Sequence, residues 1–378
     1  MKVNFNKIPL TGREISRIEK AIASGHLQGD GEFLKICEKR LCEITGAPAL
    51  LTTSCTSALD MAALLLDIKE GDEVIVPTFT FVSSVNAFVL RGAKPVFCDV
   101  REDTLNIDET KIKPLITRRT KAIVPVHYAG VSCEMDSILQ TARDANVAVV
   151  EDAAQGFCAY YKGRHLGAMG DLGALSFHGT KNVIAGEGGA LLCNRSDLFD
   201  RANFIREKGT NRIHFVEGKI DKYTWVDYGS SYIPSELIAA FLSAQLEFAK
   251  SLTADRVAAW NYYNERLAPL ERGGFIKIGK VPAGCKQNAH IFFIATESEE
   301  TTKALAAFLK SREVSAMSHY APLHTCPMAE KLGCAKTPLP VAERLARTML
   351  RLPIYSAITP DEQDWVCDCV AAFFGQKL

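Results

Sequence analysis

Short apolar runs that alternate with helical stretches recur through the first half of the chain, and this alternation constrains the fold more than any other feature. Runs such as VIVP (74–77) and VAVVED (147–152) are apolar at successive positions rather than at every second one. Strands of this kind are buried on both faces, as in a parallel sheet that is covered by helices on both sides. The sequence therefore predicts an α/β fold with a large, mostly parallel sheet.

The expected elements of this sheet region follow one another in regular order. We expect strands at residues 49–53, 73–76, 95–100, 122–126, 147–151, 174–177 and 190–193. We expect helices between them at residues 56–66, 84–90, 112–117 and 135–146. Two helices precede the sheet: one runs from a capping box, Thr11 to Glu14, to about Ser24, and one lies between Gly31 and Gly46.

The pattern changes after Ser235, where a long helical stretch continues to about Leu270. A smaller α/β segment begins near Gln287, with strands expected at 290–296 and 314–319 and helices at 301–311, 341–350 and 361–374. A chain of 378 residues has room for about two domains. We therefore expect a large domain with an N-terminal arm over residues 1–245, and a long helical connection with a small C-terminal domain over residues 246–378, the boundary falling near 245–285.

Charge and cysteine content exclude several classes of function. The formal net charge is zero, so the chain lacks the global basic field that would hold nucleic acid or an anionic membrane. The twelve cysteines are irregularly spaced, without a CxxC pair or a Cys/His set that has zinc-site spacing, so no metal site is expected. The N-terminal residues lack an apolar signal core. These features favour free thiols in a reducing cytoplasm.

The segment VVEDAAQ (149–155) places an acidic residue, Asp152, at the end of an apolar strand. Open α/β sheets bind ligands at the carboxyl edge of their strands. A carboxylate there could pair with a pyridinium nitrogen and keep it protonated, which makes the ring an electron sink. The alternative is that Asp152 caps the helix after the strand, a position that Asp favours.

The segment LSFHGTKN (175–182) places Lys181 in a turn after another strand, and the glycines of AGEGGALL (185–192) reverse the chain into the next strand. A lysine that is held between strands and partly desolvated can have a lowered pKa and attack an aldehyde. The alternative is a solvated surface lysine, which is the usual state of this residue type.

The segment TTSCTSALDMAALLL (52–66) places small hydroxyl and thiol residues between a strand and the start of a helix. Backbone N–H groups at such a helix start can bind a phosphate, with Thr56 as a further hydroxyl donor. Ordinary capping by Ser54 or Thr56 is the alternative. None of the three segments decides the function alone, but their order along the chain is more specific.

This order is similar to that of the sugar aminotransferases of the DegT/DnrJ/EryC1/StrS family, which have the aspartate aminotransferase fold (fold type I). The resemblance covers nearly the whole chain, from GDGEF (29–33) to RLPIY (351–355). Further matching segments are GDEVIVPTFTFVSS (71–84), GAKPVFCDV (92–100), AIVPVHYAG (122–130), YYKGRHLG (160–167) and HYAPLH (319–324).

The resemblance implies that the large domain binds pyridoxal 5'-phosphate and that Lys181 holds this cofactor as a Schiff base. Asp152 would pair with the pyridine nitrogen, Gln155 would lie near the 3-oxygen of the ring, and Phe81 would stack on the ring face. The other implied cofactor contacts are Cys55, Thr56 and Ser176 at the phosphate, and His178 nearby. One departure concerns an Asn that relatives donate to the phosphate across subunits, since GSSYIP (229–234) has Ile233 at that place.

The substrates implied by the resemblance are L-glutamate and a nucleotide-linked keto-sugar, bound by a homodimer. Within the family, SFHGTKN (176–182), EKGTNR (207–212) and DKYTWVDYGSSY (221–232) resemble members that aminate the 4-keto carbon of dTDP-4-dehydro-6-deoxyglucose for surface polysaccharides. Candidate substrate contacts are Arg212, His319 and Tyr320.

Several alternatives remain open for the reaction. The same chemistry at another position or on another nucleotide sugar is the nearest, and a regulatory role without catalysis is another. A sugar dehydratase is disfavoured because relatives with that activity carry His in place of the lysine. A nicotinamide dehydrogenase is disfavoured because no GxGxxG follows the first strand.

Overall fold

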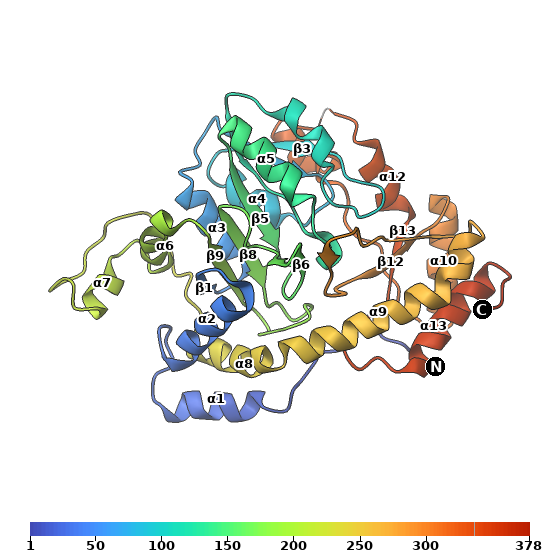
Figure 1. Cartoon of the computed structure of the whole chain (residues 1–378), viewed down its shortest axis with the longest axis horizontal. Coiled ribbons are helices and arrows are strands. Elements are labelled where there is room, and N and C mark those ends of the chain that lie inside the picture. The colour runs from blue at the N-terminus through green and yellow to red at the C-terminus, as the bar shows by residue number, and fades with distance from the viewer. Residues whose placement is uncertain (336) are drawn as a thin grey trace.

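A seven-stranded sheet forms the centre of the protein in the computed structural model, which describes residues 1–335 and 337–378 (Figure 1). The strand order is β1 (Ala49–Thr52), β9 (Gly189–Cys193), β8 (Leu172–Ser176), β5 (Ala148–Ala153), β4 (Thr120–Ile123), β2 (Glu73–Pro77) and β3 (Lys94–Cys98). β9 runs antiparallel to both of its neighbours, β1 and β8, and the other six strands share one direction. The predicted α/β fold with a mostly parallel sheet is confirmed, and it is that of fold type I.

Helices cover both faces of this sheet, because the strands carry apolar side chains on both. On one face, Leu51, Ile75 and Leu175 pack with the helices α2 (Glu32–Thr45), α5 (Met135–Ala145) and α8 (Glu236–Glu247). On the other face, Leu50 and Val74 pack with the helices α3 (Cys55–Leu65), α4 (Ser83–Val89) and α6 (Phe199–Arg206). The two buried faces fix the register of each strand, since a slip of one residue would exchange them.

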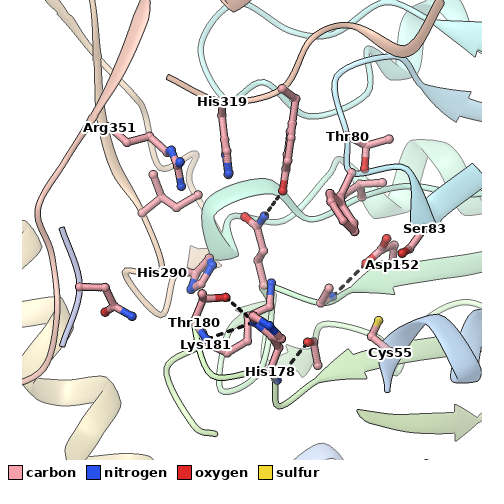
Figure 2. Close-up of a pocket in the computed structure, with 18 of the residues that line it drawn as sticks. Cys55, Thr80, Ser83, Asp152, His178, Thr180, Lys181, His290, His319 and Arg351 are labelled. Carbon is pink, nitrogen blue, oxygen red and sulfur yellow. Dashed lines mark hydrogen bonds between the residues drawn. The ribbon is translucent and has the colours of Figure 1, made fainter. Parts of the chain in front are cut away.

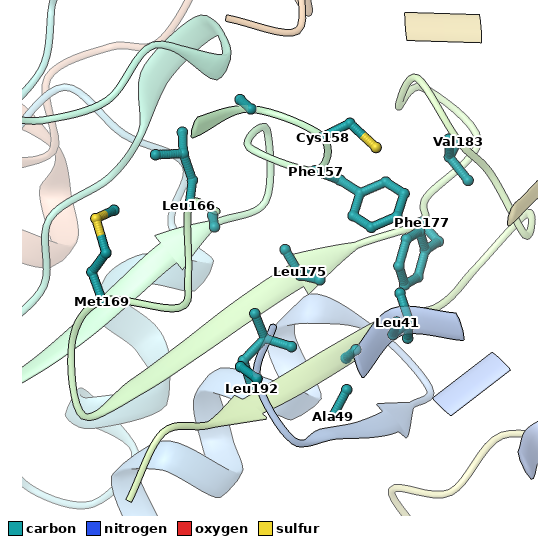
Figure 3. Packing of buried hydrophobic residues seen from close by; sticks show 14 of the residues in the cluster. Leu41, Ala49, Phe157, Cys158, Leu166, Met169, Leu175, Phe177, Val183 and Leu192 are labelled. Carbon is teal, nitrogen blue, oxygen red and sulfur yellow. The ribbon is translucent and has the colours of Figure 1, made fainter. Parts of the chain in front are cut away.

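The turn after β8 is anchored in the first of these two cores. Phe177 packs edge-on against Phe157, with 5.3 Å between the ring centroids, and Val183 lies in the same apolar cluster (Figure 3). The segment between Phe177 and Val183 is therefore held at both ends while its middle residues face away from the core.

A further apolar core, separate from the two on the faces of the large sheet, lies in the C-terminal part of the chain. It joins β10 (Lys277–Ile278), β12 (Phe292–Ala295) and β13 (Met349–Leu352) to the helices α9 (Ala249–Arg272), α10 (Glu299–Ser311) and α13 (Pro360–Phe373). Val3 of the N-terminal arm belongs to this core and bridges to Val314. We propose that this separate C-terminal core marks the division into a large domain at 1–245 and a smaller one at 246–378.

Several expected elements differ from those observed. The helix expected at 112–117 is wrong: a 3-10 turn at Lys113–Leu115 follows another at Glu109–Lys111, and the backbone is already extended at Ile116, with ψ of 127°. The strand expected at 314–319 is also wrong, since Val314 and Met317 form only isolated bridges to two different segments.

Three other element boundaries differ from those expected from the sequence. The helix expected at 341–350 ends at Thr348 in α12 (Pro340–Thr348), because the next residues pair with β12 as β13. The helical stretch from 235 to 270 is divided between α8 and α9 at Phe248. In the predicted capping box, the Glu14 carboxylate accepts the Thr11 N–H at 2.8 Å, but the helix α1 (Glu14–Ala23) begins at Glu14 itself.

The remaining elements are short. A small sheet joins β11 (Cys285–Lys286), β6 (Tyr160–Tyr161) and β7 (Arg164–His165), and α11 (Pro327–Lys331) follows the HYAPLH segment. The helix α7 (Arg212–Val216) lies on a segment that projects from the body of the molecule (Figure 1). All twelve cysteines lie in the described part of the chain and are free thiols. Across residues 1–335 and 337–378, no helix combines the length and apolarity needed to cross a membrane.

Candidate active site

A cavity of about 730 Å³ lies at the carboxyl ends of β5 and β8, beside β13 of the C-terminal part (Figure 2). The location agrees with the general rule that open α/β sheets bind ligands at the carboxyl edge of their strands. The cavity is lined by ten of the candidate residues: Cys55, Thr56, Phe81, Asp152, Gln155, Ser176, His178, Lys181, His319 and Tyr320.

Lys181 projects into this cavity from the turn that follows β8. Its backbone N–H donates to the carbonyl of His178 at 2.9 Å, and its side chain is half-buried. Burial lowers the pKa of the Lys181 amine, and the nearby Asp152 opposes that shift only in part. A larger fraction of this amine is therefore unprotonated at neutral pH than for an exposed lysine, as a nucleophile requires.

Asp152 lies at the end of β5 with its carboxylate buried. The Ser84 hydroxyl donates to one carboxylate oxygen at 2.6 Å, and the Ala154 N–H donates to the other at 3.0 Å. Ser84 in turn contacts the Thr80 hydroxyl at 2.7 Å. These contacts fix the orientation of the carboxylate; the start of α4 supplies the Ser84 hydroxyl, and the segment after β5 supplies the Ala154 N–H.

The start of α3 forms another wall of the cavity. Ser54 caps this helix by accepting the Ser57 N–H at 3.0 Å, and the Thr56 hydroxyl contacts the Ser83 hydroxyl at 2.8 Å. Burial raises the pKa of the Cys55 thiol well above its ordinary value, so this residue carries no negative charge. An uncharged thiol, two hydroxyls and the N–H groups of a helix start suit a phosphate.

Aromatic side chains line the opposite wall. The rings of His319 and Tyr320 stack with centroids 3.9 Å apart, and Phe81 lies 6.3 Å from Tyr320. Burial, with Arg351 and Lys181 nearby, lowers the pKa of His319 to about 2, so its ring is neutral. Tyr320 also contacts Gln155, one of the residues expected to bind the cofactor. The Gln155 side-chain amide donates to the Tyr320 hydroxyl at 3.3 Å.

One candidate from the sequence, Arg212, does not line the cavity of its own chain, and neither does Ile233, which stands at the place of the relatives' Asn. Arg212 lies on α7, where its guanidinium is 3.3 Å from Asp30 and 3.8 Å from Glu207. Ile233 packs against Gly29 and the first apolar core. Ile233 therefore has a packing role within its own chain. His178 lines the cavity rim but is exposed, with its ring 2.9 Å from the Thr180 hydroxyl.

Sequence reasoning missed several cavity residues. They are Phe5, Asn6, Thr80, Ser83, Thr180, Arg256, His290 and Arg351, together with Ser84 behind Asp152. Ser83 and Ser84 lie in a segment that had been matched to the family as a whole, and Arg351 opens RLPIY. Thr80 and Thr180 also lie in matched segments, so position within a matched segment was a usable signal for all five residues. The N-terminal arm and His290 carried no such signal.

The residues present fit pyridoxal phosphate by the chemistry of their donor groups. One cavity is lined by four kinds of group: an amine of lowered pKa, a buried and fixed carboxylate, an uncharged helix start with hydroxyls, and an aromatic wall. These groups match the aldehyde, the ring nitrogen, the phosphate and the ring face of that cofactor.

Comparison with family profiles matches residues 10–371 to the DegT/DnrJ/EryC1/StrS aminotransferase family. The chain is 30% identical to GDP-perosamine synthase of Escherichia coli O157:H7 over 371 residues, 97% of each chain. It is 31% identical to the spore coat polysaccharide biosynthesis protein SpsC of Bacillus subtilis, over 96% of this chain and 95% of that one. The aminotransferase of Psychrobacter cryohalolentis superposes with a TM-score of 0.93 at 28% identity, over 98% and 99% of the two chains.

Proposed function

The chain belongs to the DegT/DnrJ/EryC1/StrS aminotransferase family, and on that premise we propose that it moves the amino group of L-glutamate to the 4-keto carbon of dTDP-4-dehydro-6-deoxy-D-glucose. The product would be dTDP-4-amino-4,6-dideoxy-D-galactose, for surface polysaccharide synthesis. The coarser activity is established: the protein is an aminotransferase of nucleotide-linked sugars, and its cofactor is pyridoxal phosphate. The observation that carries the proposal is one cavity that holds both Lys181 and Asp152.

Each residue has a role that follows from its geometry. Pyridoxal phosphate supplies a carbonyl that takes up an amine and a ring that withdraws electrons from the adjacent carbon. Lys181 would first hold the cofactor. Its amine would then take a proton from the carbon that loses it and deliver the proton to the carbon that gains it. Asp152, fixed by Ser84, would keep the ring nitrogen protonated. The start of α3 would hold the phosphate.

The reaction balances without any further reactant. Glutamate is oxidised by two electrons to 2-oxoglutarate as its amine and its α-proton leave, and one water molecule supplies the new keto oxygen. The keto carbon of the sugar is reduced by the same two electrons as it gains a C–H and a C–N bond, and its oxygen leaves as water. The two substrates use the same lysine in turn, so the cycle is ping-pong.

The choice of sugar rests on the segments 176–182, 207–212 and 221–232, which resemble those of enzymes that aminate this dTDP-sugar. Within the cavity, the Tyr320 hydroxyl can hydrogen-bond to the sugar, and neutral His319 can do the same. The similarity to GDP-perosamine synthase favours a second candidate, the same reaction on a GDP-linked sugar.

A panel of nucleotide keto-sugars tests the substrate. With glutamate as donor, the dTDP-4-keto-6-deoxy sugar should exceed the UDP-linked, GDP-linked and 3-keto alternatives in kcat/KM by at least about tenfold, the discrimination that one lost contact gives. Product stereochemistry is read by NMR. Amination of only the GDP-sugar would select the second candidate, and amination of only a UDP-sugar or a 3-keto isomer would refute both.

We further propose that the protein is a homodimer with its active sites at the subunit interface. The projecting segment exposes Trp225 (79% exposed), Tyr228 (65%), Tyr223 (47%) and Phe215 (45%), and Phe81 at the cavity is 56% exposed. Exposed apolar groups of this extent mark protein–protein contacts. A partner subunit would cover them and could bring Arg212 to the second cavity.

The oligomeric state is tested by sedimentation velocity of the holoenzyme. We expect a species of twice the chain mass or four times that mass, with no monomer at the concentrations of the activity assay. Trp225→Ala should shift the distribution towards monomer and lower activity with it, whereas Trp365→Ala, at the C-terminal helix α13, should not shift it. A stable and fully active monomer would refute the proposal.

A further inference from the structure

Two residues of the N-terminal arm, Phe5 and Asn6, line the active-site cavity. Figure 2 shows Arg351 on the side of this cavity away from Cys55 and Asp152, and the centre of the Phe5 ring lies 4.7 Å from the Arg351 guanidinium carbon. The groups that suit the cofactor lie at the opposite end. The arm therefore faces the space that remains for the substrates.

The arm is anchored before these two residues. The Val3 N–H donates to the carbonyl of Glu313 at 2.9 Å, and the Val3 carbonyl accepts the Ser315 N–H at 3.0 Å. The Val3 side chain is fully buried in the C-terminal core. The backbone that leads to the cavity is therefore held both by hydrogen bonds and by apolar packing.

The arm is anchored again directly after the two cavity residues. The Lys7 amine lies 2.8 Å from the Glu362 carboxylate of α13 and 4.7 Å from the centre of the Tyr355 ring. The Pro9 carbonyl accepts a hydrogen bond from the Gln245 side-chain amide of α8 at 2.6 Å. Because the arm is held on both sides, little further conformational entropy is lost when a ligand binds to it.

The side chain of Asn6 is available to a ligand. It is half-buried, and its amide makes no hydrogen bond with residues 1–335 or 337–378, the part of the chain that the structure describes. An Asn amide presents an NH2 donor and a carbonyl acceptor side by side. A ligand group that both accepts and donates therefore satisfies this side chain most fully.

A hydroxyl is such a group, and only the sugar substrate carries hydroxyls. The carboxylates of glutamate and the diphosphate of the nucleotide accept hydrogen bonds but do not donate them. In a nucleotide-linked 4-keto-6-deoxyhexose, C1 bears the diphosphate, C4 the keto oxygen and C5 the ring oxygen, so the free hydroxyls of the hexose are at C2 and C3. The hydroxyls of the nucleoside lie beyond the diphosphate, further from the carbon that reacts at Lys181.

We propose that Asn6 hydrogen-bonds a ring hydroxyl of the keto-sugar, at C2 or C3, and thereby helps to select the sugar. This inference rests on the proposed aminotransfer to a 4-keto-6-deoxyhexose. An epimer places the hydroxyl on the other face of the ring and leaves the amide without its partner, so the contact reads the configuration at that carbon. Asn6 is therefore a specificity-determining residue that takes no part in the bond changes at Lys181.

The first test measures the two half-reactions separately, by the absorbance of the bound cofactor in single turnovers. Asn6→Ala should lower kcat/KM for whichever keto-sugar the wild type accepts by about tenfold, the usual effect of losing one hydrogen bond to a buried group. The half-reaction with glutamate should change by less than about twofold, the scatter usual for independent sites.

Asn4→Ala is the matched control for this variant. Asn4 has the same side chain two positions earlier in the arm, but it is exposed and is not part of the cavity lining. Its replacement should leave both half-reactions as they are in the wild type. A loss in Asn4→Ala equal to that in Asn6→Ala would assign the effect to the arm as a whole and overturn the inference.

The second test removes the other partner of the proposed hydrogen bond. The 2-deoxy and 3-deoxy forms of the accepted keto-sugar are compared in wild type and Asn6→Ala. One of the two should react about tenfold more slowly than the full sugar in the wild type, and at equal rates in wild type and variant, because the bond is already missing. A purely structural role of Asn6 would instead lower the rate of every sugar by the same factor.

The third test does not depend on turnover. The dTDP- and GDP-linked 6-deoxyhexoses carry a hydroxyl in place of the keto group and do not react. In calorimetry, the one that binds wild-type holoenzyme should bind Asn6→Ala about tenfold more weakly and Asn4→Ala equally well.

Three further outcomes would overturn the inference: an equal loss in Asn6→Ala for the full sugar and both deoxy forms, an equal loss in the two half-reactions, or unchanged calorimetric binding in Asn6→Ala. If the wild type aminated no keto-sugar, the proposed function would fail, while calorimetry would still decide the role of Asn6. Failure of both nucleotide sugars to bind the wild type would overturn this inference as well.

Discussion

Replacing Lys181 with alanine should lower turnover by at least about 10⁴-fold, the loss seen when a residue central to the chemistry is removed. The Lys181 amine is expected both to hold the cofactor and to move the proton between the two reacting carbons, so no other group in the cavity can take over both tasks. The variant should still bind pyridoxal phosphate through the α3 start and Asp152, but without the absorbance of the lysine-bound form. Steady-state assays and absorbance spectra check both expectations.

Lys303→Ala is the matched control for this variant. Lys303 is exposed on α10, where it pairs with Glu299 at 2.7 Å, far from the cavity lining. Its replacement should leave both turnover and the absorbance spectrum unchanged. Appreciable amino transfer by the Lys181 variant would remove this lysine from the mechanism.

Asp152→Asn should lower turnover by about 10²- to 10³-fold while retaining part of the cofactor, because a neutral ring withdraws electrons less strongly than a protonated one. The substitution keeps the size of the side chain. The one carbonyl oxygen of Asn can accept the Ala154 N–H, and the Ser84 hydroxyl can turn to accept from the amide NH2. Turnover, cofactor content and thermal unfolding are measured together.

The comparison variant is Asp136→Asn, whose carboxylate is exposed and paired with Lys162 at 2.5 Å. It should retain turnover and cofactor content. Near-normal turnover of Asp152→Asn would show that this carboxylate does not control the protonation of the ring. A variant that lost only thermal stability would indicate a structural role for Asp152.

The sheet was predictable because its strands bury both faces, which leaves continuous apolar runs in the sequence. Asp152 and Lys181 could be placed for the same reason: each follows such a run, and the carboxyl ends of parallel strands meet at one edge. The antiparallel strand β9 follows the glycine turn after Lys181, so it too was found from sequence.

Elements that depend on distant partners could not be predicted. Strand β13 exists because residues 349–352 pair with β12, and the local sequence resembles the end of a helix. The cavity contacts of Phe5, His290 and Arg351 arise where the N-terminal arm and the C-terminal part meet the large sheet. Ser84 is a further example, since its bond to Asp152 spans 68 positions of the chain. Such contacts are set by tertiary packing, which a periodic pattern does not encode.

Reductive trapping of the cofactor tests the central claim most directly. Holoenzyme is treated with borohydride, digested and mapped by mass spectrometry. We expect the reduced cofactor on the peptide that contains Lys181, and its loss from that peptide when glutamate is added before the reductant. Cofactor attached to a different lysine, or none attached to any peptide, would contradict the account.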